Sequence, residues 1–265
     1  MSAATDVVTV DRDGAVAIVT INRPDRHNAL DTATKIALRE ALDHVGGDDD
    51  VRAVVLTGAG ASFCVGQDLG EHAAALEADA STAFDTVDEH YSPIVMALAT
   101  MPKPVIAAVN GACVGAGLGF ALACDLRVLS SAATLGTAFS AIGLTCDSGL
   151  SSTLVRAVGE SRARELVLLG RPFSPEDAVR WGVAGQVCDP DEVLSSALAT
   201  AGRLAAGPTA AFAESKQLLA RAGDLPLAEA LAAESRAQAR LGLSADHAAA
   251  VRSFLVKEKP RFVGR

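Results

Sequence analysis

Residues 105–119 read VIAAVNGACVGAGLG, an apolar run that passes through Asn110-Gly111 into a glycine-rich loop. This pattern predicts a buried strand over 105–109 and, after the loop, a helix. The first N–H groups of a helix have no intrahelical partner, and the helix dipole adds partial positive charge there. We therefore expect Gly115 and Ala116 to offer backbone donors to an anion or a developing oxyanion. The alternative is that the loop only turns the chain.

A second loop follows the apolar run 51–57 and covers residues 58–68, GAGASFCVGQD. Two such loops can each place one backbone N–H on the same carbonyl oxygen, which is how acyl chemistry is stabilised in enzymes. For this loop too, a purely structural turn is the alternative. The pair of loops is thus a hypothesis about acyl chemistry.

The composition indicates a globular α/β protein. The chain has 265 residues, of which 50% are hydrophobic and 21% charged, enough for one large domain or one domain with an appendage. The formal net charge of −9 argues against nucleic acid and against a membrane surface as partners. No charge-free apolar run reaches membrane-spanning length and the first residues have no basic start, so we expect a cytoplasmic protein.

The cysteines show no disulfide or metal pattern. They lie in or beside apolar runs and form no CxxC pair: Cys64, Cys113, Cys124, Cys146 and Cys188. We expect buried free thiols in a reducing compartment. Because the histidines and cysteines are never spaced like ligands, we expect no metal site.

Strands and helices alternate in the first two thirds of the chain, which predicts an α/β unit with parallel pairing. The expected strands cover 15–21, 51–57, 103–109, 125–130 and 183–187. The expected helices cover 31–45, 69–101 with a break near Pro93, 117–124, 149–158, 160–169, a segment capped by Ser174, 191–205, 208–222, 227–241 and 244–257. The last three helices are rich in apolar residues, so we expect them either to pack on a neighbouring subunit or to cover their own core.

Taken together, an ordered series of short motifs resembles the enoyl-CoA hydratase/isomerase (crotonase) superfamily. These motifs are Asn22-Arg-Pro24, Asn28-Ala-Leu30, Phe63-Cys-Val-Gly-Gln-Asp-Leu69, Lys103-Pro-Val-Ile-Ala-Ala-Val-Asn-Gly111, Gly115-Ala-Gly117 and Cys124-Asp-Leu-Arg127. The series spans roughly residues 5 to 190, and the tail Phe254 to Phe262 is similar to the C-terminus of the family.

The resemblance implies an α/β fold, a crotonase (ClpP-like) spiral of ββα units over residues 1–205. A helical segment that forms trimers would follow over residues 206–265. The implied partner is an acyl-CoA substrate, with no cofactor beyond its coenzyme A, and the implied assembly is a homotrimer or a dimer of trimers. By motif matching, the backbone N–H groups of Gln67 and Ala116 would hold the enolate oxygen.

The chain departs from the family at two positions that decide the reaction. Hydratases of the family carry two glutamates that hold a water molecule, and the matching positions here are Gly119 and Phe139. The segment Ile142 to Gly149 resembles dienoyl-CoA and 1,2-epoxyphenylacetyl-CoA isomerases, in which an aspartate at the position of Asp147 is the catalytic carboxylate. The resemblance therefore implies an isomerase in which Asp147 is the general base.

Asp147 has a second interpretation. It stands directly before a predicted helix, so its side chain is also a candidate N-cap. The neighbours Leu144, Cys146 and Leu150 are apolar and should raise the pKa of Asp147. A single carboxylate suits the transfer of a proton between two carbons better than it suits hydration.

Family matching also implies contacts to coenzyme A. The candidates for substrate binding are Arg26, Ala29, Val65, Gly66, Asp68, Leu69, Gly115 and Lys257, the last reached from a neighbouring subunit. Asp68 is expected to bind loop backbone, and a helix over residues 69–80 with Glu71, His72 and Glu77 is expected to form a wall of the acyl pocket. For each basic residue, an ordinary solvated charge is the alternative.

Other functions stay open. A hydratase that uses an unidentified carboxylate is one alternative, and a catalytically weak acyl-CoA-binding protein is another. A dinucleotide-binding oxidoreductase fits poorly because residues 115–119 lack the full glycine spacing and position 139 is Phe rather than an acid. A serine hydrolase is disfavoured because the sequence has no G-x-S-x-G motif.

Overall fold

A six-stranded sheet forms the centre of the computed structural model, which describes residues 6–265. Its strands are β1 (Val8–Asp13), β2 (Val16–Ile21), β3 (Ala53–Gly58), β5 (Val105–Val109), β7 (Leu126–Ser130) and β9 (Gln186–Cys188), in this spatial order. β1 pairs antiparallel with β2, and the other strands run parallel. The predicted parallel pairing is confirmed, whereas β1 was not predicted and β9 begins later than the expected 183–187.

Three short strands form a second sheet. They are β4 (Ser62–Cys64), β6 (Ala112–Val114) and β8 (Leu135–Gly136), paired in parallel. Each short strand follows one long strand of the large sheet, so the chain advances as a spiral of strand pairs. The predicted crotonase-type spiral is therefore confirmed.

Helices connect the strand pairs and follow them. They are α1 (Thr32–Gly47), α2 (Leu69–Asp79), α3 (Ser92–Thr100), α4 (Ala116–Ala123), α5 (Leu150–Val158), α6 (Glu160–Leu169), α7 (Pro175–Arg180), α8 (Val193–Ala205), α9 (Thr209–Arg221), α10 (Leu227–Leu241) and α11 (Ala245–Leu255). The expected break at Pro93 is wrong: the helical backbone continues through this proline, which lies at the start of α3 directly after a π-helical turn. The break comes earlier, between α2 and a π-helical turn, Val87–Tyr91.

The large sheet is buried on both faces. Val54 and Leu56 of β3 belong to the core that also contains α1 and α3, while Val55 faces α8. This alternation follows the period of two in a strand, with both faces covered by helices. α8 meets the sheet through the small residues Ala197 and Ala201, which lie one helical turn apart and allow close packing.

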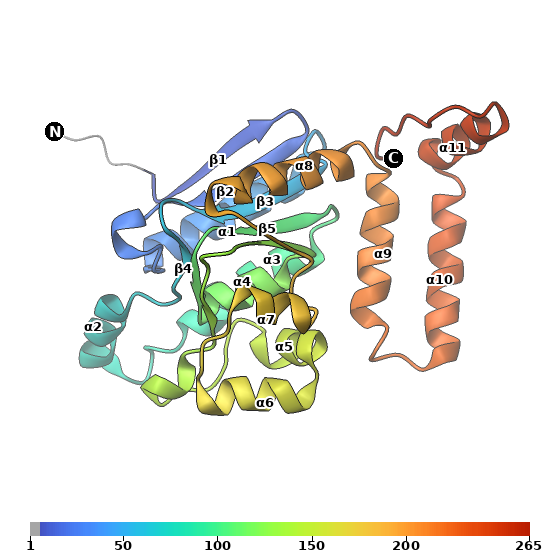
Figure 1. Cartoon of the computed structure of the whole chain (residues 1–265). Helices are drawn as coiled ribbons and strands as arrows, with labels where there is room; N and C mark the ends of the chain where they lie inside the picture. Colours follow the sequence, from blue (N-terminus) through green and yellow to red (C-terminus); the bar gives the residue numbers. More distant parts are fainter. Residues whose placement is uncertain (1–5) are drawn as a thin grey trace.

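Helices α9, α10 and α11 form an arm beside the sheet (Figure 1). The arm is tied to the core by polar contacts: Arg52 Nε donates to Thr209 Oγ1 at 3.0 Å, and Lys216 Nζ to Asp125 Oδ2 at 2.8 Å. Its large apolar side chains are exposed in the single chain, among them Leu219, Leu227, Leu231, Phe254 and Leu255. The arm therefore does not use them to cover its own core. Among residues 6–265, no helix combines the length and the apolar character that a membrane crossing needs.

Candidate active site

The described chain encloses a cavity of about 570 Å³ between the two glycine-rich loops, α2 and the start of α5. All predicted site residues except Lys257 line this cavity. It is also lined by residues of the segments Phe84–Tyr91 and Phe139–Leu144, which are far from the loops in sequence. The spiral thus brings five separate stretches of chain to one place, within residues 25–29, 65–72, 84–91, 115–116 and 137–147.

Glycines let the two loops touch. A Cβ on Gly117 would lie 2.2 Å from the carbonyl oxygen of Cys64, far inside van der Waals contact. A Cβ on Gly66, whose φ is +84°, would lie 3.3 Å from the backbone N of Ala116. Glycine is required at 66 for its left-handed backbone and at 117 for the close approach of the loop before α2 to the first turn of α4.

Two backbone donors meet at this contact. Ala116 is the first residue of α4, and Gly115 before it provides no side-chain cap. Within the described chain, neither the N–H of Ala116 nor the N–H of Gln67 donates to another group. Leu30 N–H donates to the carbonyl of Gly66 and Asp68 N–H to the carbonyl of Leu30, so the chain on both sides of Gln67 is fixed. Two backbone N–H groups without an acceptor in the described chain therefore belong to residues that line the cavity, and one of them is at a helix N-terminus.

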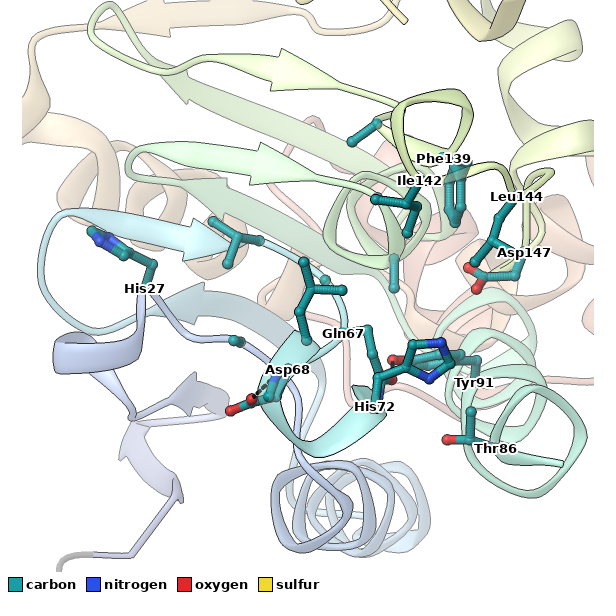
Figure 2. A pocket seen from close by; sticks show the side chains of 18 of the residues that line it. His27, Gln67, Asp68, His72, Thr86, Tyr91, Phe139, Ile142, Leu144 and Asp147 are labelled. Carbon is teal, nitrogen blue, oxygen red and sulfur yellow. Dashed lines mark hydrogen bonds between the residues drawn. The ribbon is translucent and has the colours of Figure 1, made fainter. Parts of the chain in front are cut away.

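Asp147 lies across the cavity from Gln67, His72 and Tyr91 (Figure 2). Its Oδ1 accepts a hydrogen bond from Ser148 Oγ at 2.8 Å. Burial raises the pKa of Asp147, against the opposing effect of the Ser148 hydroxyl. The predicted direction of this pKa shift is confirmed.

The capping interpretation of Asp147 is wrong. The N-cap position of α5 is Gly149, and no side chain caps that helix. Only the backbone carbonyl of Asp147 serves the first turn, by accepting from Leu150 N–H at 3.0 Å. Its carboxylate is left free to act in the cavity.

The two positions that match hydratase glutamates cannot carry that chemistry. A Cβ on Gly119 would lie 2.5 Å from Ser148 Cβ, so no larger residue fits there without a shift of the backbone before α5. Phe139 is only 7% exposed and lines the cavity with an apolar ring. Gly119 and Phe139 thus fit the packing of the cavity and leave no room for a glutamate at position 119.

Asp68 has the structural role expected of it. Its carboxylate caps α2 by accepting from the N–H groups of Gly70 and Glu71, and Arg23 Nη1 lies 3.1 Å from its Oδ2. Arg23 also pairs with Asp31 at 2.9 Å, and the side chain of Asp31 is the N-cap of α1. Arg23 therefore joins the two helices next to the cavity, a role that no local sequence pattern indicates.

The remaining predicted residues are not all at the cavity. Arg26 lines it with an exposed side chain, and Ala29 and Leu69 line it as well. The carbonyl of Ala29 already accepts from Arg23, so one of its lone pairs is occupied. Lys257 follows α11 at the end of the arm and does not line the cavity of its own chain. Glu77 is also exposed and away from the cavity.

The sequence prediction missed a buried polar group under the cavity. Lys35 is 1% exposed, whereas its apolar neighbour Ile36 is 43% exposed. Lys35 Nζ donates to Thr86 Oγ1 at 2.8 Å and lies 3.4 Å from Gln67 Oε1, which also accepts from Tyr91 Oη. The one sequence feature that could have indicated this cluster is a lysine at a position of α1 that the helical spacing places with the apolar residues.

Two N–H donors and one carboxylate with a raised pKa form a definite chemical set. The donors can stabilise negative charge on a carbonyl oxygen, and the carboxylate can remove a proton from the neighbouring carbon. Fold and cavity together thus define a protein suited to enolate chemistry on a carbonyl compound.

Comparison with known proteins agrees with that class. The model of the Enoyl-CoA hydratase/isomerase family matches residues 11–265. The 1,2-epoxyphenylacetyl-CoA isomerase of Escherichia coli is 38% identical over 250 residues, 94% of this chain and 95% of that protein. The short-chain-enoyl-CoA hydratase of Clostridium acetobutylicum is 32% identical over 258 residues, 95% of each chain.

A solved structure is equally similar in fold. The crystal structure of a Mycobacterium abscessus protein described as an enoyl-CoA hydratase/isomerase has a TM-score of 0.94 and 50% identity, covering 97% of this chain and all of that one. The chain therefore belongs to the enoyl-CoA hydratase/isomerase (crotonase) family. It is an enzyme of that family, whose substrates are acyl-CoA thioesters.

Proposed function

We propose that the protein is an acyl-CoA isomerase that moves a double bond, or opens an epoxy-type acyl group, through an enolate. Gln67 N–H and Ala116 N–H bind the thioester oxygen, and Asp147 is the only general base. The observation that carries the proposal is the position of Asp147: a half-buried carboxylate with a raised pKa that lines the same cavity as Gln67 and Ala116.

For a 3-enoyl thioester the step balances without a further reactant. Asp147 takes the proton from C2, and the electron pair of that C–H bond spreads over the thioester oxygen and the C3–C4 double bond. The two N–H groups hold the resulting dienolate. Asp147 then returns the proton to C4, which leaves the double bond between C2 and C3.

Coenzyme A is part of the substrate in this proposal, and no separate cofactor takes part. Arg26 and the backbone of Ala29, which line the cavity, would contact its polar end. The exposed apolar side chains of the arm support assembly into a trimer or a dimer of trimers. In such an assembly Lys257 of one chain would approach the coenzyme A bound to another.

The test compares two substrates and one isosteric variant. Wild-type protein should isomerise a 3-enoyl-CoA, and Asp147→Asn should lose about 10²–10⁴ of kcat/KM because the amide cannot accept the proton. Efficient hydration of a 2-enoyl-CoA that survives Asp147→Asn would instead establish the hydratase alternative. Binding of acyl-CoA without turnover of an enoyl, dienoyl or epoxy substrate would establish the binding-protein alternative.

The same variant should leave the fold intact. Because burial raises the pKa of Asp147 in the folded state, the folded protein binds this proton more tightly than the unfolded chain does. The contribution of Asp147 to stability is therefore complete at low pH and decreases as pH rises through its folded pKa. The asparagine of Asp147→Asn does not ionise, so this variant avoids the decrease in stability at high pH. The thermal unfolding temperature of the variant near pH 8 should therefore equal or exceed that of wild type. A variant that is inactive but equally stable has lost chemistry and not structure.

A further inference from the structure

One side-chain amide stands beside the reacting end of the cavity. The Oε1 of Gln67 accepts a hydrogen bond from Tyr91 Oη, and Lys35 Nζ lies 3.4 Å from the same oxygen. A lysine ammonium has no lone pair and can only donate. The phenol also stays protonated, because burial first and the charge of Asp147 second raise the pKa of Tyr91. Two donors thus fix the carbonyl side of the Gln67 amide.

These donors belong to the core and cannot swing away. Lys35 is 1% exposed and Tyr91 is 2% exposed. Lys35 Nζ also donates to Thr86 Oγ1 at 2.8 Å and lies 3.5 Å from Glu71 Oε1. A buried ammonium is costly unless its hydrogens are used, so the set holds together as a unit. The Gln67 side chain is therefore held in one orientation before any substrate binds.

The other side of that amide has no partner. Within the described chain, the hydrogen bonds of the Gln67 side chain all involve Oε1, and Nε2 has no acceptor. Among fully buried side-chain polar atoms of residues 6–265, only Asn110 Oδ1 lacks a partner, so the unpaired Nε2 is not sealed in protein. Gln67 lines the cavity, which is therefore the space that its unpaired side-chain N–H groups can face.

Besides the polar side chains of His72, Thr86 and Asp147, the cavity has an apolar wall that gives this donor no partner. Phe139, Ile142 and Leu144 line the same cavity and offer no hydrogen-bond acceptor from their side chains. A hydrocarbon acyl chain would displace water from Nε2 and leave it unpaired, which costs binding free energy. An acyl chain with an oxygen in the right place would satisfy it. Sites that hold such a fixed polar group discriminate strongly against analogues without the matching atom.

The reach of the side chain limits where that oxygen lies. The backbone N–H of the same residue is the proposed donor to the thioester oxygen, so Nε2 can meet only atoms a few bonds from the thioester carbon. We propose that Gln67 Nε2 determines specificity by binding an acceptor oxygen, such as an ether or epoxide oxygen, two or three atoms beyond the thioester carbon. This inference rests on the proposed function, because it places the thioester at Gln67 N–H.

The test uses pairs of unreactive thioesters with nearly equal shape. Methoxyacetyl-CoA matches butanoyl-CoA, and 3-methoxypropanoyl-CoA matches pentanoyl-CoA, except that an ether oxygen replaces one methylene group. Calorimetric titration gives the ratio of Kd values within each pair. Wild type should bind the ether of at least one pair about threefold to tenfold more tightly, as one hydrogen bond allows.

Two variants of one residue separate the donor from the shape of its side chain. Gln67→Met keeps the length and the backbone N–H but removes the donor, so the ratio should fall to about 1. Gln67→Glu keeps an oxygen for Tyr91 and Lys35 but turns a second oxygen to the cavity. Repulsion between lone pairs should then reverse the preference in favour of the hydrocarbon thioester.

Each outcome supports or overturns the proposed role of Gln67 Nε2. Equal binding within both pairs by wild type, or a preference that survives Gln67→Met, overturns the role of Nε2 while acyl-CoA binding stands. If neither variant folds, the wild-type ratios alone decide. If wild type binds none of the four thioesters, the proposed function fails, and this inference with it.

Discussion

The two sides of the cavity are built in contrasting ways. On one side every residue of α4 is buried, and the short strand β4 that precedes the Gln67 loop is buried as well. On the other side α2 has no buried residue at all. The first side offers main-chain N–H groups fixed by the core, and the second offers side chains such as His72 on a partly solvated helix.

This contrast separates two tasks. Charge stabilisation needs donors that do not reorganise during the reaction, and backbone held in a core meets that need. Discrimination among acyl groups needs surfaces that can vary without harm to the fold. Gln67 contributes to both tasks. Its backbone N–H lies in the rigid loop, while its side-chain amide contacts Tyr91 and Lys35. Substitutions on the first side should affect all substrates alike, and those on the second should change substrate preference.

Gly117→Ala should break the rigid side most severely. The new Cβ would lie 2.2 Å from the backbone oxygen of Cys64, so the loop and α4 must separate. We expect destabilisation of about 1–3 kcal/mol or more and a loss of kcat/KM of about 10²–10³ for every substrate. Chemical denaturation and steady-state assays would measure the two effects.

The matched control for it is Gly202→Ala. This glycine lies in α8 with no atom within 4 Å of an added Cβ, so the change should be neutral or stabilising by about 0.5–1 kcal/mol. If Gly117→Ala proves as harmless as Gly202→Ala, the close contact between the loops does not matter to the site.

Ala116→Val should have the next largest effect. Ala116 is 3% exposed, and a β-branched side chain at the first position of α4 would crowd the thioester and tilt the N–H. We expect kcat to fall about 10- to 100-fold with a smaller change in KM, because the donor acts mainly on the enolate. Ala116→Gly keeps the N–H without bulk and should retain much more of kcat. Equal losses in both variants would remove Ala116 N–H from the mechanism.

How far the sequence predicts this contrast depends on how local each feature is. The glycine-rich loops and the Ser174 cap are each specified by a few neighbouring residues, and the structure has them where these residues predict. The role of Asp147 is implied by resemblance to a family segment, and Asp147 lines the cavity. The short strand β8 has two residues, too few to show an alternating pattern. It exists because β6 is there to pair with it.

The contacts among Lys35, Thr86, Gln67 and Tyr91 could not be predicted either, because they join distant parts of the sequence. They join Gln67 to Tyr91 and Lys35, which lie 24 and 32 positions away in the chain. Such pairs are set by how α1 and the segment before α3 pack, and no single stretch of sequence encodes that geometry. A lysine among the apolar positions of α1 indicates only that some partner is buried with it.

The pH dependence of kcat/KM in Ser148→Ala should test whether Asp147 is the general base. The Ser148 hydroxyl donates to Asp147 Oδ1 at 2.8 Å and so favours the charged carboxylate, against the larger effect of burial, which raises the pKa. The base must be ionised to act, so activity should fall as pH decreases through this pKa. Loss of the hydroxyl raises the pKa further and should move the acid limb of kcat/KM to higher pH. An unchanged limb would mean that another group sets it.

His72→Ala should give the smallest effect and the one most dependent on substrate. His72 lines the cavity from α2 and meets Phe84 edge-to-face with ring centroids 5.2 Å apart. Its removal therefore enlarges the cavity and leaves the two glycine-rich loops unchanged. We expect kcat/KM to change by about threefold to tenfold, in favour of bulkier acyl groups, because one lost contact in an apolar pocket is worth about 1 kcal/mol. Glu77→Ala, on the exposed face of the same helix, should change neither rate nor preference. A uniform loss across acyl chain lengths in His72→Ala would place this side chain in the reaction itself and remove the division between a rigid catalytic side and a variable wall.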